Sequence, residues 1–247
     1  MRVIQFFALA VAFLTGPAIR AQQPVTLTAS DGVRVFGTYY PAASTSTPII
    51  LLFHQAGSNR REYAPIAPRL VSANFSSLAI DARHGGKMWD RENETVTRLG
   101  HEASYLEALA DLEAALAWAR NQSPPRKVIV WGSSYSACLV FVLTAKHPSE
   151  IAGLLSFSPA EYFQNKSLVH EATAKVNVPV FITSAKDTEE EEAARSIFNA
   201  TADEKDRVLF VPRIAGVHGS STLREDRNPE GAAENWLAVF AFLKRFQ

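Results

Sequence analysis

Residues 128–140 read VIVWGSSYSACLV, and this stretch decides how the chain is organised. Its first part is a short continuous apolar run, which is typical of a strand buried on both faces. Its last part continues into the apolar segment 136–147, which predicts a helix that stops before Pro148. For a plain turn between the two, Asn-Gly or Asp-Gly would be enough, and no hydroxyl groups would be needed. The glycine and the serines at this corner therefore predict a nucleophile on a strand-to-helix turn.

The neighbouring residues indicate which serine is the nucleophile. A nucleophile on such a strained turn needs small residues two positions before and after it, so that the backbone can fold back on itself. Ser134 has Gly132 and Ser136 at these positions, whereas Ser133 has aromatic residues there. We therefore predict that Ser134 is the nucleophile. The alternative is that Ser134 only caps the following helix, because serine at a helix start commonly accepts a backbone N–H.

Strand and helix patterns alternate along the chain after an opening hairpin pattern at 25–42, which turns at Asp31-Gly32. This alternation predicts an α/β fold: a mostly parallel sheet with helices on both faces, an opening antiparallel hairpin and no large lid domain. One irregular insertion, 159–177, separates two strands. The further strands are predicted within 47–57, 75–86, 127–132, 151–158, 178–185 and 207–214, and the helices within 59–74, 101–121, 136–147, 189–200 and 229–246.

Size and charge narrow the function classes. The chain has 247 residues, of which 47% are hydrophobic and 20% charged, and its formal net charge is zero. We expect residues 22–247 to form a single domain with a large core. A neutral chain carries no electrostatic footprint for nucleic acid or for an anionic membrane. A small-molecule substrate fits this balance better, and the oligomeric state is left open.

The N-terminus predicts export. Arg2 precedes the apolar run VIQFFALAVAFL, and small residues follow up to Ala21. We interpret residues 1–21 as a signal peptide cleaved after Ala21, or alternatively after Ala18. The run is too short for a spanning helix, which needs about 20 residues, so an uncleaved anchor is the less favoured alternative. We expect the mature protein to be periplasmic or secreted, without stable membrane insertion.

Cysteine and histidine usage excludes a metal site of the usual kind. Cys138 is the one cysteine, and it lies in an apolar helix segment, where a buried small residue is expected. The six histidines are scattered along the chain. We expect no bound metal and no cofactor.

The carboxyl ends of the strands bring further polar groups to one edge, where ligands sit in sheets of this kind. The early strand ends at His54-Gln55-Ala56-Gly57, a late strand ends at Asp187, and His218 follows the last strand. A serine, an acid and a histidine thus follow one another in that order along the chain, all at this edge of the sheet. Asp187 is favoured as the acid because it comes earliest after its strand, but Glu189 and Glu190 follow it and Glu161 precedes it. The alternative for Asp187 is a helix start, where acidic residues are favourable.

These motifs together resemble the α/β-hydrolase superfamily, and within it the small dienelactone-hydrolase-like enzymes that lack a lid. The resemblance rests on Gly132-Ser133-Ser134-Tyr135-Ser136, on His54-Gln55-Ala56-Gly57, on Asp187 and on His218, and it covers nearly all of the mature chain. The chain departs from the family pattern at Ser136 and Gln55, where glycine is usual. Dienelactone hydrolases proper also use a cysteine nucleophile in place of a serine.

The resemblance implies acyl transfer. His218 would take the proton of Ser134, and Asp187 would orient His218. The N–H of Tyr135 and that of Ala56, with Gln55 as the neighbouring candidate, would form the oxyanion hole, while His54 would brace that loop. The expected function is a serine hydrolase that cleaves small carboxylic esters or lactones. The alternatives are a peptidase or amidase of the same superfamily and a non-catalytic member that binds a ligand.

Overall fold

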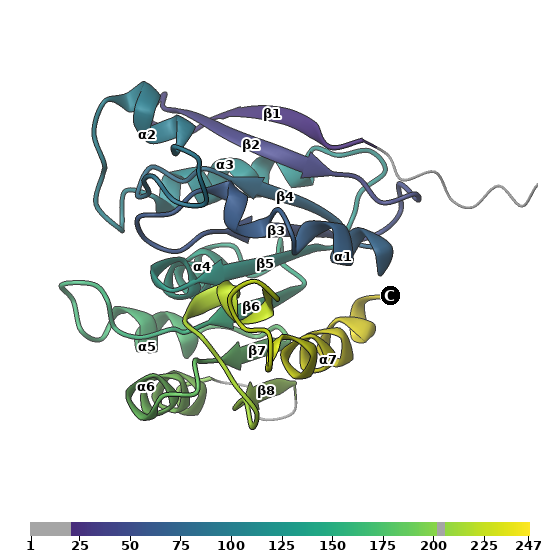
Figure 1. The fold of residues 1–247 in the computed structure, drawn as a ribbon. Coiled ribbons are helices and arrows are strands. Elements are labelled where there is room, and N and C mark those ends of the chain that lie inside the picture. Colours follow the sequence, from purple (N-terminus) through teal and green to yellow (C-terminus); the bar gives the residue numbers. More distant parts are fainter. Residues whose placement is uncertain (1–20, 202–205) are drawn as a thin grey trace, which may run out of the picture.

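Eight strands form a single sheet in the order β1-β2-β4-β3-β5-β6-β7-β8 (Figure 1). The computed structural model describes residues 21–201 and 206–247, so the predicted signal peptide lies outside the described residues except for Ala21. From β4 to β8 all neighbouring strands are parallel. The strands are β1 (Gln23–Thr28), β2 (Arg34–Tyr40), β3 (Ile49–Phe53), β4 (Ser76–Ile80), β5 (Val128–Ser133), β6 (Gly153–Phe157), β7 (Val180–Thr183) and β8 (Arg207–Phe210).

The opening hairpin is antiparallel, as predicted. Strand β1 pairs with β2, and β2 pairs with β4, both antiparallel. The turn between β1 and β2 closes with a hydrogen bond from the Gly32 N–H to the Ala29 carbonyl at 2.9 Å. Gly32 has φ +85°, a left-handed conformation that glycine adopts without steric cost. The hairpin extends the parallel sheet by two strands.

Helices cover both faces of the sheet, as the alternating pattern predicted (Figure 1). Side chains of β3 point alternately to the two faces: Ile49 and Leu51 belong to the core under α3, α4, α5 and α6, whereas Ile50 and Leu52 belong to the core under α1 and α7. The α-helices are α1 (Ala67–Ser72), α2 (Glu94–Leu99), α3 (Leu109–Arg120), α4 (Tyr135–Lys146), α5 (Leu168–Thr173), α6 (Thr188–Asn199) and α7 (Ala232–Leu243), and the 3-10 helices are η1 (Arg60–Tyr63), η2 (Gly219–Leu223) and η3 (Lys244–Phe246).

Three helices differ from the prediction. The helix expected within 101–121 begins only at Leu109, and Leu106 before it is 45% exposed. Helix α5 lies inside the insertion that was predicted to be irregular. Helix α2 was not predicted, because six residues are too short to show a helical period. It is defined by its ends, where Asn93 caps the start and Gly100, at φ 84°, ends it.

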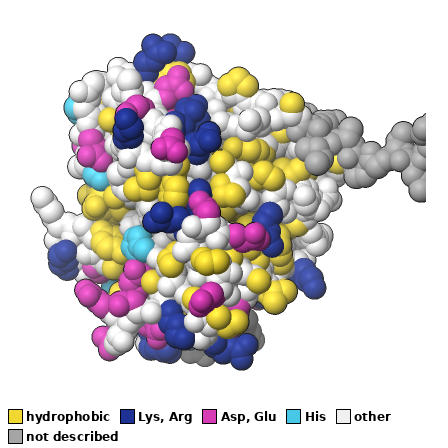
Figure 2. Space-filling view, viewed as in Figure 1, with side chains coloured by type: hydrophobic (Ala, Val, Ile, Leu, Met, Phe, Trp, Pro, Cys, Tyr) yellow, Lys and Arg dark blue, Asp and Glu magenta, His cyan; other side chains and the backbone are white. Residues whose placement is uncertain are grey.

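The surface shows no segregation of charge on the face seen in Figure 2, where acidic and basic side chains lie interspersed among hydrophobic ones. Among the described residues, no helix is both long and apolar enough to cross a membrane. Likewise, no three His, Cys, Asp or Glu side chains of the described residues are grouped so that they could hold a metal ion.

Candidate active site

The residues predicted to be functional lie at the carboxyl edge of the central strands. In the sheet, Phe53 of β3 pairs with Gly132 of β5, and Ser133 of β5 pairs with Phe157 of β6. The loops that follow these three strands therefore start side by side. The Ser136 hydroxyl donates a hydrogen bond to the His54 carbonyl at 2.7 Å, which joins the start of α4 to the loop after β3.

Ser134 occupies a strained position between β5 and α4. Its φ of 59° and ψ of −122° lie in a region that residues other than glycine rarely adopt. A Cβ atom at Gly132 would lie 2.1 Å from the Ser136 carbonyl oxygen, so that position accepts only glycine. The Ser134 N–H donates to the Phe157 carbonyl at 2.8 Å, which helps to hold the turn. This is the geometry that the sequence predicted for a nucleophile on a strand-to-helix turn.

The two neighbouring serines have different surroundings. The Ser133 hydroxyl is buried, donates to Glu62 Oε1 at 2.7 Å and accepts the Ser220 N–H at 2.8 Å. Ser134 is 8% exposed, and its side chain lies beside the Tyr162 hydroxyl, where burial raises the pKa of Tyr162 and the hydrogen bond with Ser134 opposes that rise. The Ser133 hydroxyl is thus occupied by internal hydrogen bonds, whereas Ser134 keeps a small exposure to solvent.

His218 is hydrogen-bonded to Glu190 and not to Asp187. His218 Nδ1 lies 2.7 Å from Glu190 Oε1, and Glu190 Oε2 accepts the Ala185 N–H at 2.9 Å. The Asp187 carboxylate instead accepts the N–H groups of Glu189 and Glu190 at 3.1 and 3.2 Å and caps the start of α6. The predicted contact between Asp187 and His218 is therefore corrected, because the cap turns Asp187 towards its own helix.

The electrostatics of this pair favour an ionised carboxylate beside the imidazole. Burial alone would raise the pKa of Glu190, but hydrogen bonds from His218, Ser158 and the Ala185 N–H outweigh burial and lower this pKa to about 2. In turn, the hydrogen bond with Glu190 raises the pKa of His218 above its ordinary value, against the effect of burial. If Nδ1 carries the proton shared with Glu190, then Nε2 is free to accept another proton.

The turn after His218 is fixed directly against the Ser134 turn. The Gly219 N–H donates to Ser158 Oγ at 2.9 Å, and the Ser220 N–H donates to Ser133 Oγ at 2.8 Å. Gly219 has φ +66°, and a Cβ atom there would lie 2.3 Å from Ser133 Oγ, so the approach requires glycine. His218 directly precedes Gly219 in the chain. Ser134 directly follows Ser133, so the proposed base and nucleophile both lie next to this contact.

Two backbone N–H groups near Ser134 are available for a ligand. Within the described residues, the N–H groups of Tyr135 and Ala56 have no protein acceptor. Tyr135 is the first residue of α4, where backbone N–H groups have no partner within the helix. The N–H of Gln55, the neighbouring candidate, is already taken by Glu62 Oε2 at 2.9 Å. The two free groups are thus the pair predicted first, and Gln55 is excluded as a free donor.

His54 fixes the direction of the Ala56 N–H. The imidazole is fully buried, its Nε2 accepts the Ala82 N–H at 3.0 Å, and its Nδ1 therefore donates to the Gln55 carbonyl at 2.8 Å. Burial lowers the pKa of His54, which agrees with a neutral ring. In a trans peptide the N–H points opposite to the carbonyl of the same unit, so holding the Gln55 carbonyl also aims the Ala56 N–H. This is the bracing role expected for His54.

A second serine, histidine and acid are connected elsewhere on the molecule. Glu161 Oε1 lies 2.7 Å from His170 Nδ1, and His170 Nε2 lies 3.0 Å from Ser196 Oγ. Ser196 is exposed in the middle of α6, so its helix offers no free N–H groups beside the hydroxyl. Glu161, which the sequence offered as a further alternative for the acid, thus belongs to this surface contact between α5 and α6.

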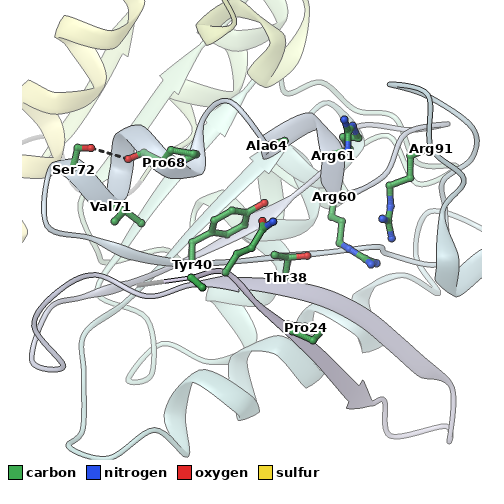
Figure 3. Close-up of a pocket in the computed structure, with 12 residues that line it drawn as sticks. Pro24, Thr38, Tyr40, Arg60, Arg61, Ala64, Pro68, Val71, Ser72 and Arg91 are labelled. Carbon is green, nitrogen blue, oxygen red and sulfur yellow. Dashed lines mark hydrogen bonds between the residues drawn. The ribbon is translucent and has the colours of Figure 1, made fainter. Parts of the chain in front are cut away.

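The open cleft drawn in Figure 3 lies apart from Ser134. It has a volume of about 770 Å³, and Tyr40, Thr38 and Pro24 of the hairpin face Arg60 and Pro68 across it. Neither Ser134 nor His218 lines this cleft. Since Arg60 is already paired with Asp81 and Glu94, we place no chemistry in it.

Sequence reasoning missed the roles of Glu62 and Ser158, and it ranked Glu190 behind Asp187. The signal for Glu190 was present: an acid three residues after a helix cap reaches back over the helix start. Asp187 and Glu190 have this spacing. Glu62 contacts Ser133, which is 71 positions away in the sequence, so no local pattern reveals it.

Comparisons with known proteins agree with this fold. A family model described as serine aminopeptidase S33 matches residues 44–205. The quorum-quenching protein AidA of Acinetobacter baumannii is 30% identical over 124 residues, which is 49% of this chain and 38% of that protein. The matched part therefore spans well under half the length of this curated relative.

Solved structures with the same fold include several enzymes. A dienelactone hydrolase from Anabaena variabilis has a TM-score of 0.70 at 18% identity, with 92% of this chain and 98% of the other covered. An esterase from Pyrococcus furiosus has a TM-score of 0.67 at 20% identity, with 92% and 93% covered. A thermostable carboxyl esterase from Bacillus coagulans has a TM-score of 0.71 at 13% identity, with 92% and 99% covered. At these identities the likeness concerns the fold.

Proposed function

The chain belongs to the serine aminopeptidase S33 family of α/β-hydrolases, and from this premise we propose that it cleaves small carboxylic esters or lactones with Ser134, His218 and Glu190. The observation that carries the proposal is the strained φ of 59° at Ser134. Such strain persists only where the surrounding structure enforces it, and it is concentrated at active sites. A helix cap alone would not need it.

The proposed reaction proceeds through an acyl-enzyme. His218 Nε2 takes the proton of Ser134 Oγ as that oxygen attacks the carbonyl carbon. Collapse of the tetrahedral intermediate breaks the bond to the alcohol oxygen, which leaves with the proton from Nε2. Water then attacks the acyl carbon and gives a proton to His218 Nε2. Collapse of this second intermediate breaks the bond to Ser134 Oγ, which takes the proton back from Nε2 as the carboxylic acid is released. Glu190 holds Nδ1 and stabilises the imidazolium in both halves.

The oxyanion of each tetrahedral intermediate would be bound by the N–H groups of Ala56 and Tyr135. These groups have no protein acceptor within the described residues. Fixed donors of this kind stabilise charge that develops only in the transition state, and each contributes about 3–4 kcal/mol.

The substrate class is proposed from the names of relatives. Esterases and a dienelactone hydrolase share the fold. The family description names an aminopeptidase, so an amide substrate is the alternative. We also propose that the protein is exported, from the signal peptide predicted in residues 1–21; N-terminal sequencing of the mature protein tests this.

Labelling of the mature protein with a fluorophosphonate, followed by peptide mapping, tests the proposed nucleophile. We expect a single label on Ser134 and none in Ser134→Ala. Ser196 provides an internal control, because it also contacts a histidine but lacks adjacent N–H donors. A label on Ser196, or no label on folded protein, would contradict the proposal, and no label would favour a ligand-binding role.

A substrate panel then separates the reaction classes. We expect turnover of p-nitrophenyl acetate and butyrate and of δ-valerolactone, and slower or no turnover of aminoacyl p-nitroanilides. A preference for the anilides in an enzyme labelled on Ser134 would keep the nucleophile and replace the ester by an amide substrate.

A further inference from the structure

Glu62 is a buried carboxylate that contacts two segments of the candidate site. It lies in η1 and is fully buried. The Ser133 hydroxyl donates to its Oε1 at 2.7 Å, and the Gln55 N–H donates to its Oε2 at 2.9 Å. Ser133 precedes the proposed nucleophile, and Gln55 precedes Ala56, a proposed oxyanion donor.

A third segment joins the same chain of hydrogen bonds. Ser133 Oγ accepts the Ser220 N–H at 2.8 Å, two residues after His218. Ser220 Oγ in turn accepts the Trp131 Nε1–H at 2.9 Å and lies 3.3 Å from the Tyr63 hydroxyl. Through Ser133, the Glu62 carboxylate is thus connected to the segments that carry the proposed nucleophile and base. Through Gln55 it is connected to the segment that carries the proposed oxyanion donor.

The hydrogen-bond pattern requires acceptors at both oxygens of Glu62. A backbone N–H and a hydroxyl that already accepts another N–H both donate to it, and a carboxylate accepts both. A side-chain amide offers only one oxygen, so it would leave one of the two donors without an acceptor. Glutamine is therefore close in shape but mismatched in hydrogen bonding.

Glu62 is costly for the fold. No Lys, Arg or His of the described residues forms a salt bridge with it within 4.0 Å. Burial raises the pKa of Glu62, and the opposing effects of hydrogen bonds and of the positive charge of Arg224 only partly cancel this rise. The hydrogen bonds come from Gln55, Ser133 and Ser58. A buried acid without an ion pair adds little stability or subtracts from it. Its contacts point to a role in arranging the site.

We propose that Glu62 is a positioning residue that holds the Ala56 N–H, Ser134 and His218 in register for the acyl transfer proposed above, on which this inference rests. It fixes the Gln55 N–H, while His54 fixes the Gln55 carbonyl. Two successive peptide planes are then set, and the second of them carries the Ala56 N–H. Displacement of such a donor by about 1 Å lowers the rate by about 100-fold.

The test compares Glu62→Gln, Ser133→Ala, the double variant and the wild type. We measure kcat and KM with p-nitrophenyl butyrate, inhibition by phenylboronic acid and the melting temperature. In Glu62→Gln we expect kcat to fall about 10- to 100-fold with KM within about threefold. The inhibition constant of the boronic acid, a mimic of the tetrahedral intermediate, should rise in parallel. The melting temperature should change little, because removal of a buried charge offsets the cost of the unpaired donor.

Ser77→Ala is the matched control for Ser133→Ala. Ser77 Oγ is likewise buried, lies in β4 and has no hydrogen-bond partner among the residues that the structure describes. We expect wild-type kinetics for Ser77→Ala and a fall in kcat at constant KM for Ser133→Ala. In the double variant the loss should be smaller than the product of the single losses, because both substitutions break one chain of hydrogen bonds.

Three results would overturn the inference: wild-type kcat in folded Glu62→Gln, a loss confined to KM, or a double variant whose loss equals the product of the single losses. If Glu62→Gln does not fold, Ser133→Ala carries the test, and wild-type kcat there overturns it. Wild-type protein that is not labelled on Ser134 would instead refute the proposed function itself, and that result is seen before any variant is compared.

Discussion

Glu190 Oε1 and His218 Nδ1 lie 2.7 Å apart, and this contact joins the start of α6 to the loop before η2. The carboxylate that comes first after β7, Asp187, instead accepts N–H groups at the start of its own helix. The two acids are only three residues apart, yet one faces the imidazole and the other faces backbone N–H groups. Their roles can therefore be separated by substitution.

Substitution of Glu190 should abolish most of the activity, whereas substitution of Asp187 should not. In Glu190→Gln the amide can donate to Nδ1 and favour the wrong tautomer of His218, so we expect kcat/KM to fall about 100-fold or more. In Asp187→Ala the helix loses its cap, which costs about 1 kcal/mol of stability, while kcat/KM stays within about threefold. Ester hydrolysis and urea unfolding measure both. A larger activity loss in Asp187→Ala would restore Asp187 as the acid.

The pH dependence of activity should follow His218. Hydrolysis needs the neutral imidazole, so kcat/KM falls as the pH drops through the pKa of His218. Because Glu190 raises this pKa, we expect the midpoint above the ordinary value of 6.5. Removing the charge in Glu190→Gln should move the midpoint of the residual activity to lower pH. Rates measured from pH 5 to 9 test this, and a flat wild-type profile would exclude His218 as the base.

The sequence predicted the parts of the site that depend on local geometry. The strained turn at Ser134 needs small neighbours, and Gly132 and Ser136 are visible in the sequence. His218 was found because it follows the last strand and is flanked by glycine. The positions of the strands were also predictable, since continuous apolar runs bounded by polar turns mark buried strands.

The residues that were missed depend on contacts between distant segments. Choosing between Asp187 and Glu190 requires the starting residue of α6, which the acidic run leaves ambiguous. In the sequence, Glu62 is one polar residue of a predicted helix. Its contact with Ser133 exists only in the folded protein and could not be predicted. Helix α3 was extended too far because Leu106 has the helical spacing, although the segment before Leu109 folds as turns, with the Ala103 N–H bound to the Arg83 carbonyl.

Cys138 should be unreactive in the native protein. Its thiol is fully buried, donates to the Ala160 carbonyl at 2.8 Å, and has its pKa raised by burial to about 12. Since the thiolate is the reactive form, we expect no reaction with a disulfide reagent at pH 8 until the protein unfolds. Activity should also survive treatment with iodoacetamide. Loss of activity together with alkylation of Cys138 in folded protein would point to a cysteine-dependent hydrolase.

Arg83 forms salt bridges with two carboxylates, one of them buried and the other exposed to solvent. It is paired with Asp111, which is fully buried, at 2.7 Å, and with Asp31, whose side chain is 45% exposed. Asp111 Oδ2 also accepts the Arg83 N–H at 2.7 Å, so its loss leaves both charge and backbone unpaired in the core.

We therefore expect Asp111→Ala to lower the free energy of unfolding by about 3–5 kcal/mol. Asp31→Ala should lower it by only about 0–1 kcal/mol, since solvent and salt screen the exposed pair. Urea titrations at low and high salt measure both variants, and only the smaller effect should shrink as salt is added. Equal losses in the two variants would mean that Asp31 is as well shielded from solvent in solution as Asp111. In that case the hairpin that carries Asp31 would pack more tightly against Arg83 than its exposure indicates.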